Sequence, residues 1–486
     1  MGYNICVREK IDNIINGRVG KLIDGFFNSQ FYPYVAAAVS IFAHCLDLPV
    51  LGVFLHAILL CVSFIFCKNT LVIVPFALLC PFVMSENTMP DLGYYNTPFR
   101  ISSLVLCLAF AVAAFSFNLI YYGKWKVIFK KAYLTVSLSL MSGALVLGGL
   151  FSEDFCLTGV LISLAIAVCV FLPYSMLVNS ADYKGKESVK YFANISVAAA
   201  ITVGTFVLQQ YCLHDFVTDP VAVKGFLKLG AVGPNTGAAI MLIALPMTFY
   251  LIYVYKYGFL YYILLVAEVF AMIMTYSRAA LVVAIPGTVL VSFILCFKNK
   301  TGKLGYWITF GILMSVALAF TITYKETVVK TVLSLFEDGS DSGRIELWAV
   351  GFENWKKHPI FGLGMWFLPR HGNWYYSFHC TPLTYLYSGG VVGFIAYAYH
   401  RYKTVRLVFT AKLNSKRVFL ALAVLATLLN ALLDLGMTNP FHLLYYSTMI
   451  GLIECDARAV SGAGGNTALN KSNDAAATPR ENSEGF

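Results

Sequence analysis

Charged residues are scarce in this sequence. Only 12% of the 486 residues are Asp, Glu, Lys or Arg, whereas 59% are hydrophobic and the mean hydropathy is +0.72. A soluble domain needs a larger polar share to cover its surface. Apolar runs of about 20 residues recur along most of the chain, and each could cross a hydrocarbon core as a helix. We therefore expect an all-α, polytopic integral membrane bundle of about 12–14 transmembrane helices.

Several motifs of other protein classes are also missing. There is no Gly-rich Lys-Ser/Thr phosphate loop, so a nucleotide-driven reaction is disfavoured. The 12 cysteines form no CxxC pair and mostly lie inside apolar runs, which indicates small buried residues rather than metal ligands. The polar first 30 residues contain no recognisable cleavable signal peptide. We predict neither a metal site nor a cofactor.

The formal net charge of +10 has a membrane explanation. Lys and Arg gather in the cytoplasmic loops of multi-pass proteins, so the excess does not indicate nucleic-acid binding.

The apolar runs predict spans that are listed here with boundaries good to a few residues: 34–46, 49–67, 71–84, 101–122, 133–151, 156–178, 192–213, 236–255, 259–275, 279–297, 305–324, 383–399, 418–435 and 441–453.

The basic residues also predict an orientation. When the N-terminus is placed inside, Lys and Arg concentrate in alternate connections along the whole chain, most densely in 124–131, 184–190 and 401–417. We therefore expect a cytoplasmic N-terminal segment (1–30), a transmembrane domain (31–456) and a disordered cytoplasmic tail (457–486). The large polar loop, 325–380, falls on the extracytoplasmic side.

A short amphipathic helix is expected inside this loop. It covers about 342–358, with Asp341 or Ser342 as its N-cap and Pro359 at its end. One face carries the arginine and aromatic side chains Arg344, Trp348, Phe352 and Trp355. Such a face suits the membrane surface, with rings at headgroup depth, but a plain amphipathic loop helix has the same spacing.

Four stretches at the expected outer boundary carry a resemblance. They are VGPNTGAA (232–239), MTYSRAALVVA (274–284), SGRIELWAVGFENWKKHPIFGLG (342–364) and FHCTPLTYLYSGGVVG (378–393). In this order and topology, over roughly 205–393, the chain resembles the O-antigen ligase and O-antigen polymerase superfamily of lipid-linked glycan transferases.

The resemblance implies roles for two arginines and an asparagine. Arg278, in the Ser-Arg motif, and Arg344 would hold the diphosphate of a polyprenyl (undecaprenyl) carrier, and Asn235 would line the site. Guanidinium groups bind phosphate oxygens in two-pronged fashion and stabilise a diphosphate leaving group without a metal. An interfacial anchor is the alternative for Arg278, and a helix cap is the alternative for Asn235.

His379 is the candidate catalytic base, at the point where the large loop re-enters the membrane. A neutral imidazole there could accept the proton of an acceptor hydroxyl. His358 and His371 are rivals in the same loop. The superfamily usually has His-Asn at this point, whereas here Cys380 follows the histidine, so the role of that amide is in doubt.

Other polar and small residues have two interpretations. Gly389, Gly390 and Gly393 would allow close helix packing behind the site. Glu268, in the middle of a span, and Asn430 and Asp434, on one face of the next-to-last span, could bind a sugar or pair inside the bundle.

These inferences predict a metal-independent glycosyltransferase at the outer face of the bacterial cytoplasmic membrane. It would move a glycan from polyprenyl diphosphate to an acceptor hydroxyl on a lipid, a protein or another glycan. The alternatives are a polymerase of the same superfamily and a lipid-linked sugar transporter or flippase, which should show half-helices or inverted repeats. A polymerase of the shape, elongation and division family would instead use an outer-loop carboxylate such as Glu337, Asp338 or Asp341.

Overall fold

The computed structural model describes most of the chain, and all structural statements below concern that part. The described residues are 2–83, 98–151, 157–179, 183–213, 227, 229, 233–298, 303–323, 325, 344–365, 370–371, 374–375, 378–433 and 440–463. Asp434, Glu337, Asp338 and the two predicted N-cap residues, Asp341 and Ser342, lie outside them.

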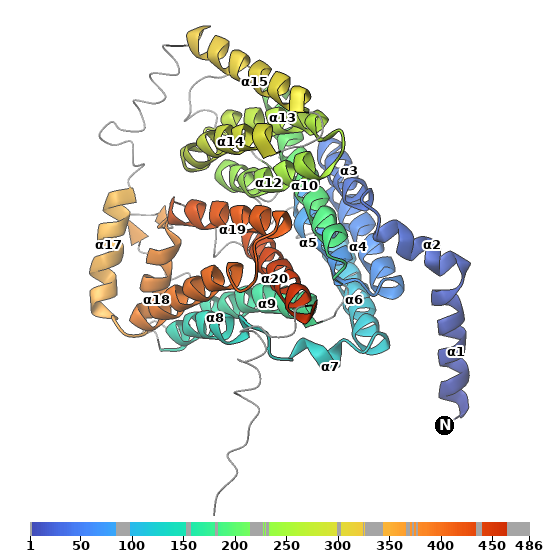
Figure 1. Cartoon of the computed structure of the whole chain (residues 1–486). Helices are drawn as coiled ribbons and strands as arrows, with labels where there is room; N and C mark the ends of the chain where they lie inside the picture. The colour runs from blue at the N-terminus through green and yellow to red at the C-terminus, as the bar shows by residue number, and fades with distance from the viewer. Residues whose placement is uncertain are drawn as a thin grey trace, which may run out of the picture.

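The described elements are almost all helices (Figure 1). They are α1 (Gly2–Asn16), α2 (Arg18–Phe27), α3 (Tyr32–Cys45), α4 (Pro49–Phe66), η1 (Thr70–Ile73), α5 (Val74–Leu79), η2 (Cys80–Val83), α6 (Pro98–Tyr121), α7 (Trp125–Ile128), α8 (Thr135–Leu150), α9 (Leu157–Asn179), α10 (Lys186–Leu213), α12 (Pro234–Val254), η5 (Gly258–Tyr261), α13 (Tyr262–Met274), α14 (Arg278–Lys298), α15 (Lys303–Thr323), α17 (Arg344–Lys357), β1 (Arg370–His371), β2 (Trp374–Tyr375), α18 (Thr381–Val408), α19 (Ser415–Leu433) and α20 (Pro440–Ala463).

The all-α, polytopic prediction is confirmed. Six of the described helices are long and apolar enough to cross a membrane: α4, most of α9, α10, α12, α14 and α19. Five shorter apolar helical segments occupy other predicted spans. The two strands form a single antiparallel pair, with Arg370 opposite Tyr375 and His371 opposite Trp374. The total of 12–14 spans stays a prediction.

Three predicted segments differ from the observed helices. The span expected over 71–84 is divided into η1, α5 and η2, with prolines at positions 75 and 81 interrupting the helical hydrogen bonds. Helix α18 continues to Val408, beyond its expected end at 399. Helix α20 continues to Ala463, so the first seven residues of the expected disordered tail, 457–463, are helical.

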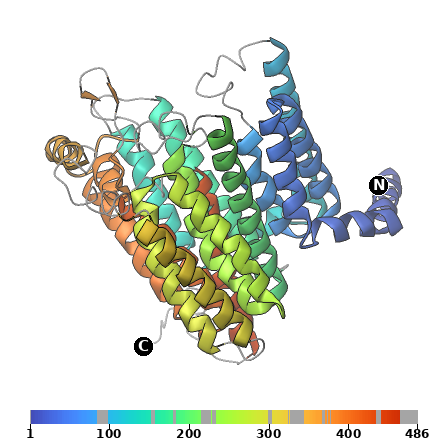
Figure 2. The ribbon, with the colours of Figure 1, turned by 90° about the horizontal axis from the view of Figure 1, so that it is seen from above.

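The long helices run side by side in alternating directions, which gives the bundle two ends. Figure 2 shows α17 and the strands at the upper end and α2 lying across the lower end of the N-terminal helices. We call these the loop end and the basic end. The connections 122–134, 183–185 and 409–414, expected inside, share the basic end with α2. Of the segments expected outside, the described turn 275–277 and helix α17 lie at the loop end. The grouping matches the prediction, and the membrane orientation itself stays a prediction.

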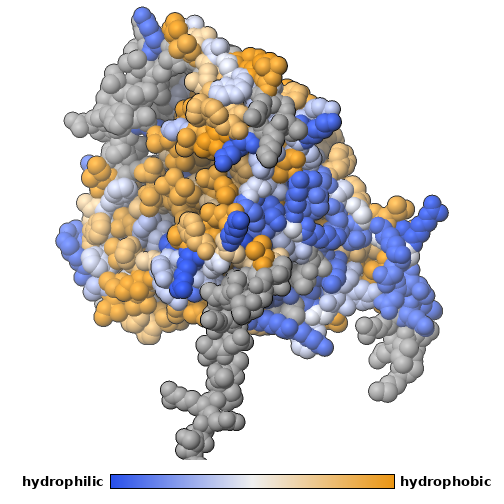
Figure 3. Space-filling view, viewed as in Figure 1, coloured by the Kyte–Doolittle hydropathy of each residue, from blue (hydrophilic) through white to orange (hydrophobic). Residues whose placement is uncertain are grey.

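Apolar side chains cover much of the helix surface. Val105 and Leu108 on α6, Val282 and Leu290 on α14 and Ile395 on α18 are all exposed. Figure 3 shows apolar residues over the centre and lower left of one face and hydrophilic residues towards the right, where α1 and α2 lie. Such surface is unfavourable in water, so hydrocarbon is its natural surrounding.

A buried ion pair closes the basic end. The guanidinium of Arg417 (0% exposed) donates to the Asp456 carboxylate (1% exposed) at 2.8 Å. Lys416 lies 2.8 Å from the same carboxylate, the side chain of Asn414 donates to it at 2.8 Å, and the Tyr183 hydroxyl donates at 3.1 Å. Asp456 therefore joins α19, α20 and the α9–α10 connection.

We predict that Asp456→Asn destabilises the protein by about 3–5 kcal/mol, because it leaves a buried guanidinium without a counter-charge. The matched control is Glu353→Gln, which removes an exposed pair with Lys356 (2.7 Å) and should change stability by less than about 1 kcal/mol. Thermal unfolding in detergent measures both. Equal midpoints for the two variants would contradict the assigned role of Asp456.

Candidate functional site

Arg278 begins α14 at the loop end, after a tight three-residue turn from α13. Within this turn the Thr275 hydroxyl donates to the carbonyl of Met272 at 2.7 Å and accepts from the Ser277 amide at 3.3 Å. Tyr276 has a φ of 51°, a conformation uncommon for residues other than glycine. The turn places the half-buried Arg278 at the end of the bundle, as the sequence predicts.

Asn235 lies in the first turn of α12, directly after Pro234, and is half-buried at the same end. The N-cap position is Gly233, without a side-chain capping bond. Asn235 therefore sits inside the helix and is not its cap. Helix α12 packs against α14 and α19, which places Asn235 and Arg278 on neighbouring helices.

His379 lies two residues before α18 and has a φ of 46°. The left-handed region costs a residue with a Cβ roughly 1–2 kcal/mol, so the surrounding contacts must hold His379 in place. Phe378, on one side, is fully buried. Cys380, on the other, is half-buried, and burial raises the pKa of its thiol, which keeps it protonated at neutral pH.

Helix α17 is fastened to this segment. The indole Nε1 of Trp348 donates to the carbonyl oxygen of Phe378 at 2.8 Å. A side chain at Gly351 would meet the Phe378 ring, and that ring lies 4.8 Å from the ring of Tyr387 on α18. Trp348 therefore fixes the peptide unit directly before His379. Arg344 precedes Trp348 by about one helical turn on the same face of α17. The contact of Trp348 therefore brings the first turn of α17, which contains Arg344, toward His379.

The expected aromatic face of α17 is consequently divided. Trp348 packs toward Phe378, Leu363 and Tyr387, whereas Phe352 is exposed. The Trp355 indole donates to the carbonyl of Pro359 at 3.2 Å. The interpretation of this face as a continuous membrane-surface ridge is wrong for Trp348, since its ring docks α17 onto α18.

Helix α18 is broken at Gly390, which has φ 62° and ψ −159°. The segment 359–364 inserts beside the break and hydrogen-bonds to the freed backbone groups. The amides of Leu363 and Gly364 donate to the carbonyls of Tyr387 and Ser388, both at 2.9 Å. In return, the amides of Val391 and Val392 donate to the carbonyls of Pro359 and Ile360, at 2.8 and 3.3 Å.

Glycines make this insertion possible. Gly362 (φ 72°) and Gly364 (φ 83°) have left-handed backbones, and Gly364 packs on the backbone of Gly149 in α8. Gly389 and Gly393 lie against Ala144 of α8, so the predicted close helix packing is confirmed for them. Gly390 differs, because its backbone conformation and its contact with Ile360 both require glycine.

Two of the other polar candidates are buried inside the bundle. The Glu268 carboxylate accepts a hydrogen bond from the Thr248 hydroxyl at 2.9 Å, which favours internal pairing over sugar binding. Asn430 is also buried. Across the described residues, no three His, Cys, Asp or Glu side chains gather into a group that could hold a metal ion.

The site residues thus share one end but come from different parts of the bundle. The structure joins α17, which begins at Arg344, to the segment of His379. Helix α19 packs against α12, α14 and α18, and Figure 1 shows it between α12 and α18. Sequence reasoning missed Trp348 as an anchor and the break at Gly390; the clustered glycines and HPIFGLG were the available signals.

These features define a polytopic helical membrane protein whose candidate site is built at one end from a broken helix and a docked loop helix. Residues 260–398 match the family model described as O-Antigen ligase. This match confirms the resemblance to the O-antigen ligase superfamily and indicates a glycan-transferring membrane enzyme. It includes Arg278, Arg344 and His379, whereas Asn235 lies outside it. No curated protein matches the chain.

Proposed function

We propose that the protein transfers a glycan from a polyprenyl diphosphate carrier to an acceptor hydroxyl at the outer face of a bacterial cytoplasmic membrane. The observation that carries this proposal is the bond from Trp348 to the carbonyl of Phe378. It links the helix that begins at Arg344 to the histidine inside the matched family region. In this proposal, Arg344 supplies a cation and His379 a base within one structural unit at the loop end.

The proposed reaction is a direct displacement. The acceptor oxygen attacks the anomeric carbon while His379 accepts the hydroxyl proton, and the bond between that carbon and the diphosphate oxygen breaks. The lipid diphosphate leaves with the bonding electrons, and Arg278 and Arg344 balance its charge. The anomeric configuration inverts, because the nucleophile enters opposite the leaving group. Asn235 would orient the sugar or the diphosphate.

The break in α18 does not favour the transporter alternative. Half-helices in transporters offer free backbone groups to ions or substrates. Here the groups freed by Gly390 are bonded to Pro359, Ile360, Leu363 and Gly364 of the same chain. The break therefore serves as a docking place for the loop segment, which supports a fixed catalytic site.

An assay with purified protein, a polyprenyl diphosphate glycan and lipid, protein or glycan acceptors tests this proposal. Arg278→Ala should lower transfer by about 100-fold, since it removes one stabilising donor for the leaving group. Arg406→Ala, an exposed arginine at the basic end, is the control and should retain activity. Transfer should continue with a chelator present. No transfer to any acceptor by the wild type, or strict metal dependence, would contradict the proposal.

A second test concerns Trp348. We predict that Trp348→Phe lowers transfer about tenfold, because it removes the hydrogen bond to Phe378 and keeps most of the ring packing. The loss should fall on kcat rather than KM, since the change affects the placement of His379. The matched control is Trp355→Phe, which removes the hydrogen bond from the indole of Trp355 to the carbonyl of Pro359 and leaves the bond to Phe378 in place. Equal activities of the two variants would refute the role of Trp348.

A further inference from the structure

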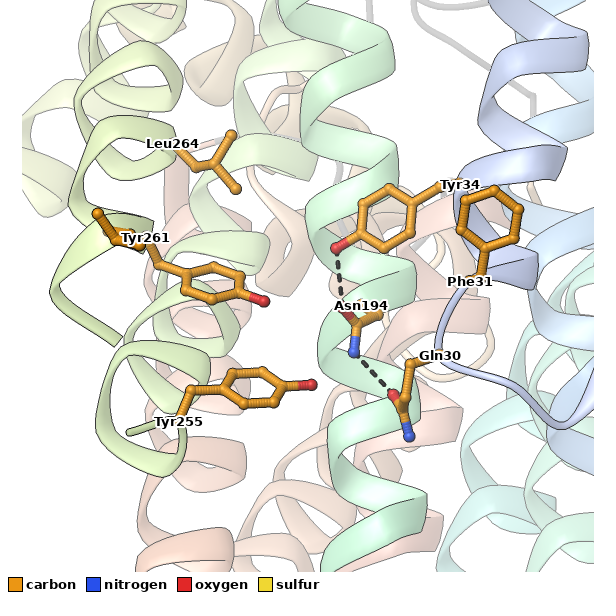
Figure 4. Close-up of a pocket in the computed structure, with 8 residues that line it drawn as sticks. Gln30, Phe31, Tyr34, Asn194, Tyr255, Tyr261 and Leu264 are labelled. Carbon is orange, nitrogen blue, oxygen red and sulfur yellow. Dashed lines mark hydrogen bonds between the residues drawn. The ribbon is translucent and has the colours of Figure 1, made fainter. Parts of the chain in front are cut away.

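A pocket of about 520 Å³ lies at the basic end, opposite the candidate active site. It is lined by Gln30, Phe31, Tyr34, Asn194, Tyr255, Leu260, Tyr261 and Leu264 (Figure 4). These residues come from the α2–α3 connection, α3, α10, the end of α12, η5 and α13. Its size suits a small organic group, and it involves none of the residues assigned to glycan transfer.

Hydrogen bonds hold one wall of this pocket. The Tyr34 hydroxyl donates to Asn194 Oδ1 at 2.8 Å, and Asn194 Nδ2 donates to Gln30 Oε1 at 2.7 Å and to the Lys190 carbonyl at 2.8 Å. Because both N–H donors of the Asn194 amide are thus used, it acts as scaffold and offers no donor to a bound anion. Figure 4 shows the hydroxyls of Tyr255 and Tyr261 on the opposite wall, both pointing toward Asn194.

The phenol groups that line the pocket, together with the neighbouring Lys190, suit an anion. Tyr255 and Tyr261 stack at 5.4 Å, which places their hydroxyls side by side as hydrogen-bond donors. The Lys190 ammonium lies 5.3 Å from the centre of the Tyr255 ring, and Glu187 pairs with it at 3.1 Å. The eight lining residues include no Asp or Glu. Phenolic donors beside a lysine match phosphate oxygens.

The rim of the pocket suits lipid chains. Phe31 is 65% exposed and Leu260 is 55% exposed, so apolar side chains stand at the opening. Helix α2, which leads into Gln30, exposes Val19 and Leu22 together with Arg18 and Lys21. Apolar and basic exposure on one short helix is typical of a helix lying in the membrane interface. It places the pocket near headgroup depth.

We propose that this pocket binds an anionic phospholipid of the leaflet at the basic end. The phosphate accepts hydrogen bonds from Tyr255 and Tyr261 near Lys190, and the acyl chains pass over Phe31 and Leu260. The site is separate from the proposed transfer reaction and does not depend on it.

Native mass spectrometry of the full chain tests the lipid site. The protein is released from vesicles of phosphatidylglycerol and phosphatidylcholine, and the retained lipid is measured. Tyr255→Phe/Tyr261→Phe should weaken phosphatidylglycerol retention by at least about tenfold, since two hydrogen bonds to a charged phosphate are lost. The matched control Tyr253→Phe/Tyr257→Phe alters two nearby tyrosines outside the lining and should retain lipid as the wild type does.

Each other outcome overturns the proposal. Equal retention by both double variants would show that the lipid binds elsewhere. Retention of phosphatidylcholine equal to that of phosphatidylglycerol would show that the pocket does not select an anionic lipid. Displacement of the lipid by inorganic phosphate alone would identify a simple anion site. Tyrosine-dependent retention of added polyprenyl diphosphate in place of phosphatidylglycerol would assign the pocket to the carrier. Thermal unfolding midpoints confirm that each variant is folded.

Discussion

His379→Asn is expected to lower glycan transfer by about 10²–10⁴-fold while the protein remains folded, because the variant loses only the proposed general base. Asparagine tolerates the left-handed backbone better than other residues with a Cβ, so the φ of 46° can be kept. The assay is transfer from a polyprenyl diphosphate glycan to acceptor, and the midpoint of thermal unfolding reports the folded state.

Two rival histidines provide the controls. His358 lies just after α17 and His371 lies in β1, both in the same loop. His358→Ala and His371→Ala should each retain transfer within a few-fold of the wild type. If His379→Asn instead transfers normally and one of these variants does not, the base has been assigned to the wrong residue.

Gly390→Ala is expected to destabilise the protein by about 3 kcal/mol or more. The backbone at Gly390 has a positive φ with an extended ψ, a region almost restricted to glycine, and a Cβ there would overlap the carbonyl group of Ile360. The variant must therefore release segment 359–364 or distort α18. Since that segment follows α17, transfer activity should fall as well.

The neighbouring glycine gives a matched control. A Cβ at Gly389 would lie 3.5 Å from the nearest atom, the carbonyl oxygen of Ala144, which is an ordinary contact. Gly389→Ala should change stability by less than about 1 kcal/mol. The measurement is the unfolding midpoint in the same detergent for both variants. Equal midpoints would mean that the break at Gly390 is not needed for the fold.

Hydropathy was sufficient to predict most of the architecture. A helix that crosses a membrane must be apolar for most of its length, so runs such as 49–67 and 279–297 reappear as α4 and α14 almost residue for residue. The alternation of basic connections also predicted which segments share an end of the bundle. The ends of α18 and α20 were harder to predict. Both helices continue as polar segments past their apolar parts, where hydropathy gives no signal.

The candidate site was predicted only in part. Motif order placed Arg278, Asn235 and His379 at one end, since each follows or precedes a span. The Trp348 contact with Phe378 and the hydrogen bonds between segment 359–364 and α18 join residues that are separated in the sequence. A local sequence pattern does not predict such contacts. The pocket lined by Tyr255 and Tyr261 was missed for the same reason, as its walls come from separate helices.

The most direct test of the central claim is to determine which side of the membrane α17 faces. Transfer at the outer face requires the lipid diphosphate and the proposed base, His379, to face the same outer compartment. Lys356→Cys on α17 and Lys412→Cys in the 409–414 connection would each be placed in a chain whose native cysteines are replaced by serine. A membrane-impermeant thiol reagent is then added to intact cells. We predict labelling at position 356 at once and at 412 only after permeabilisation. Labelling at 412 in intact cells, with 356 protected, would contradict transfer at the outer face.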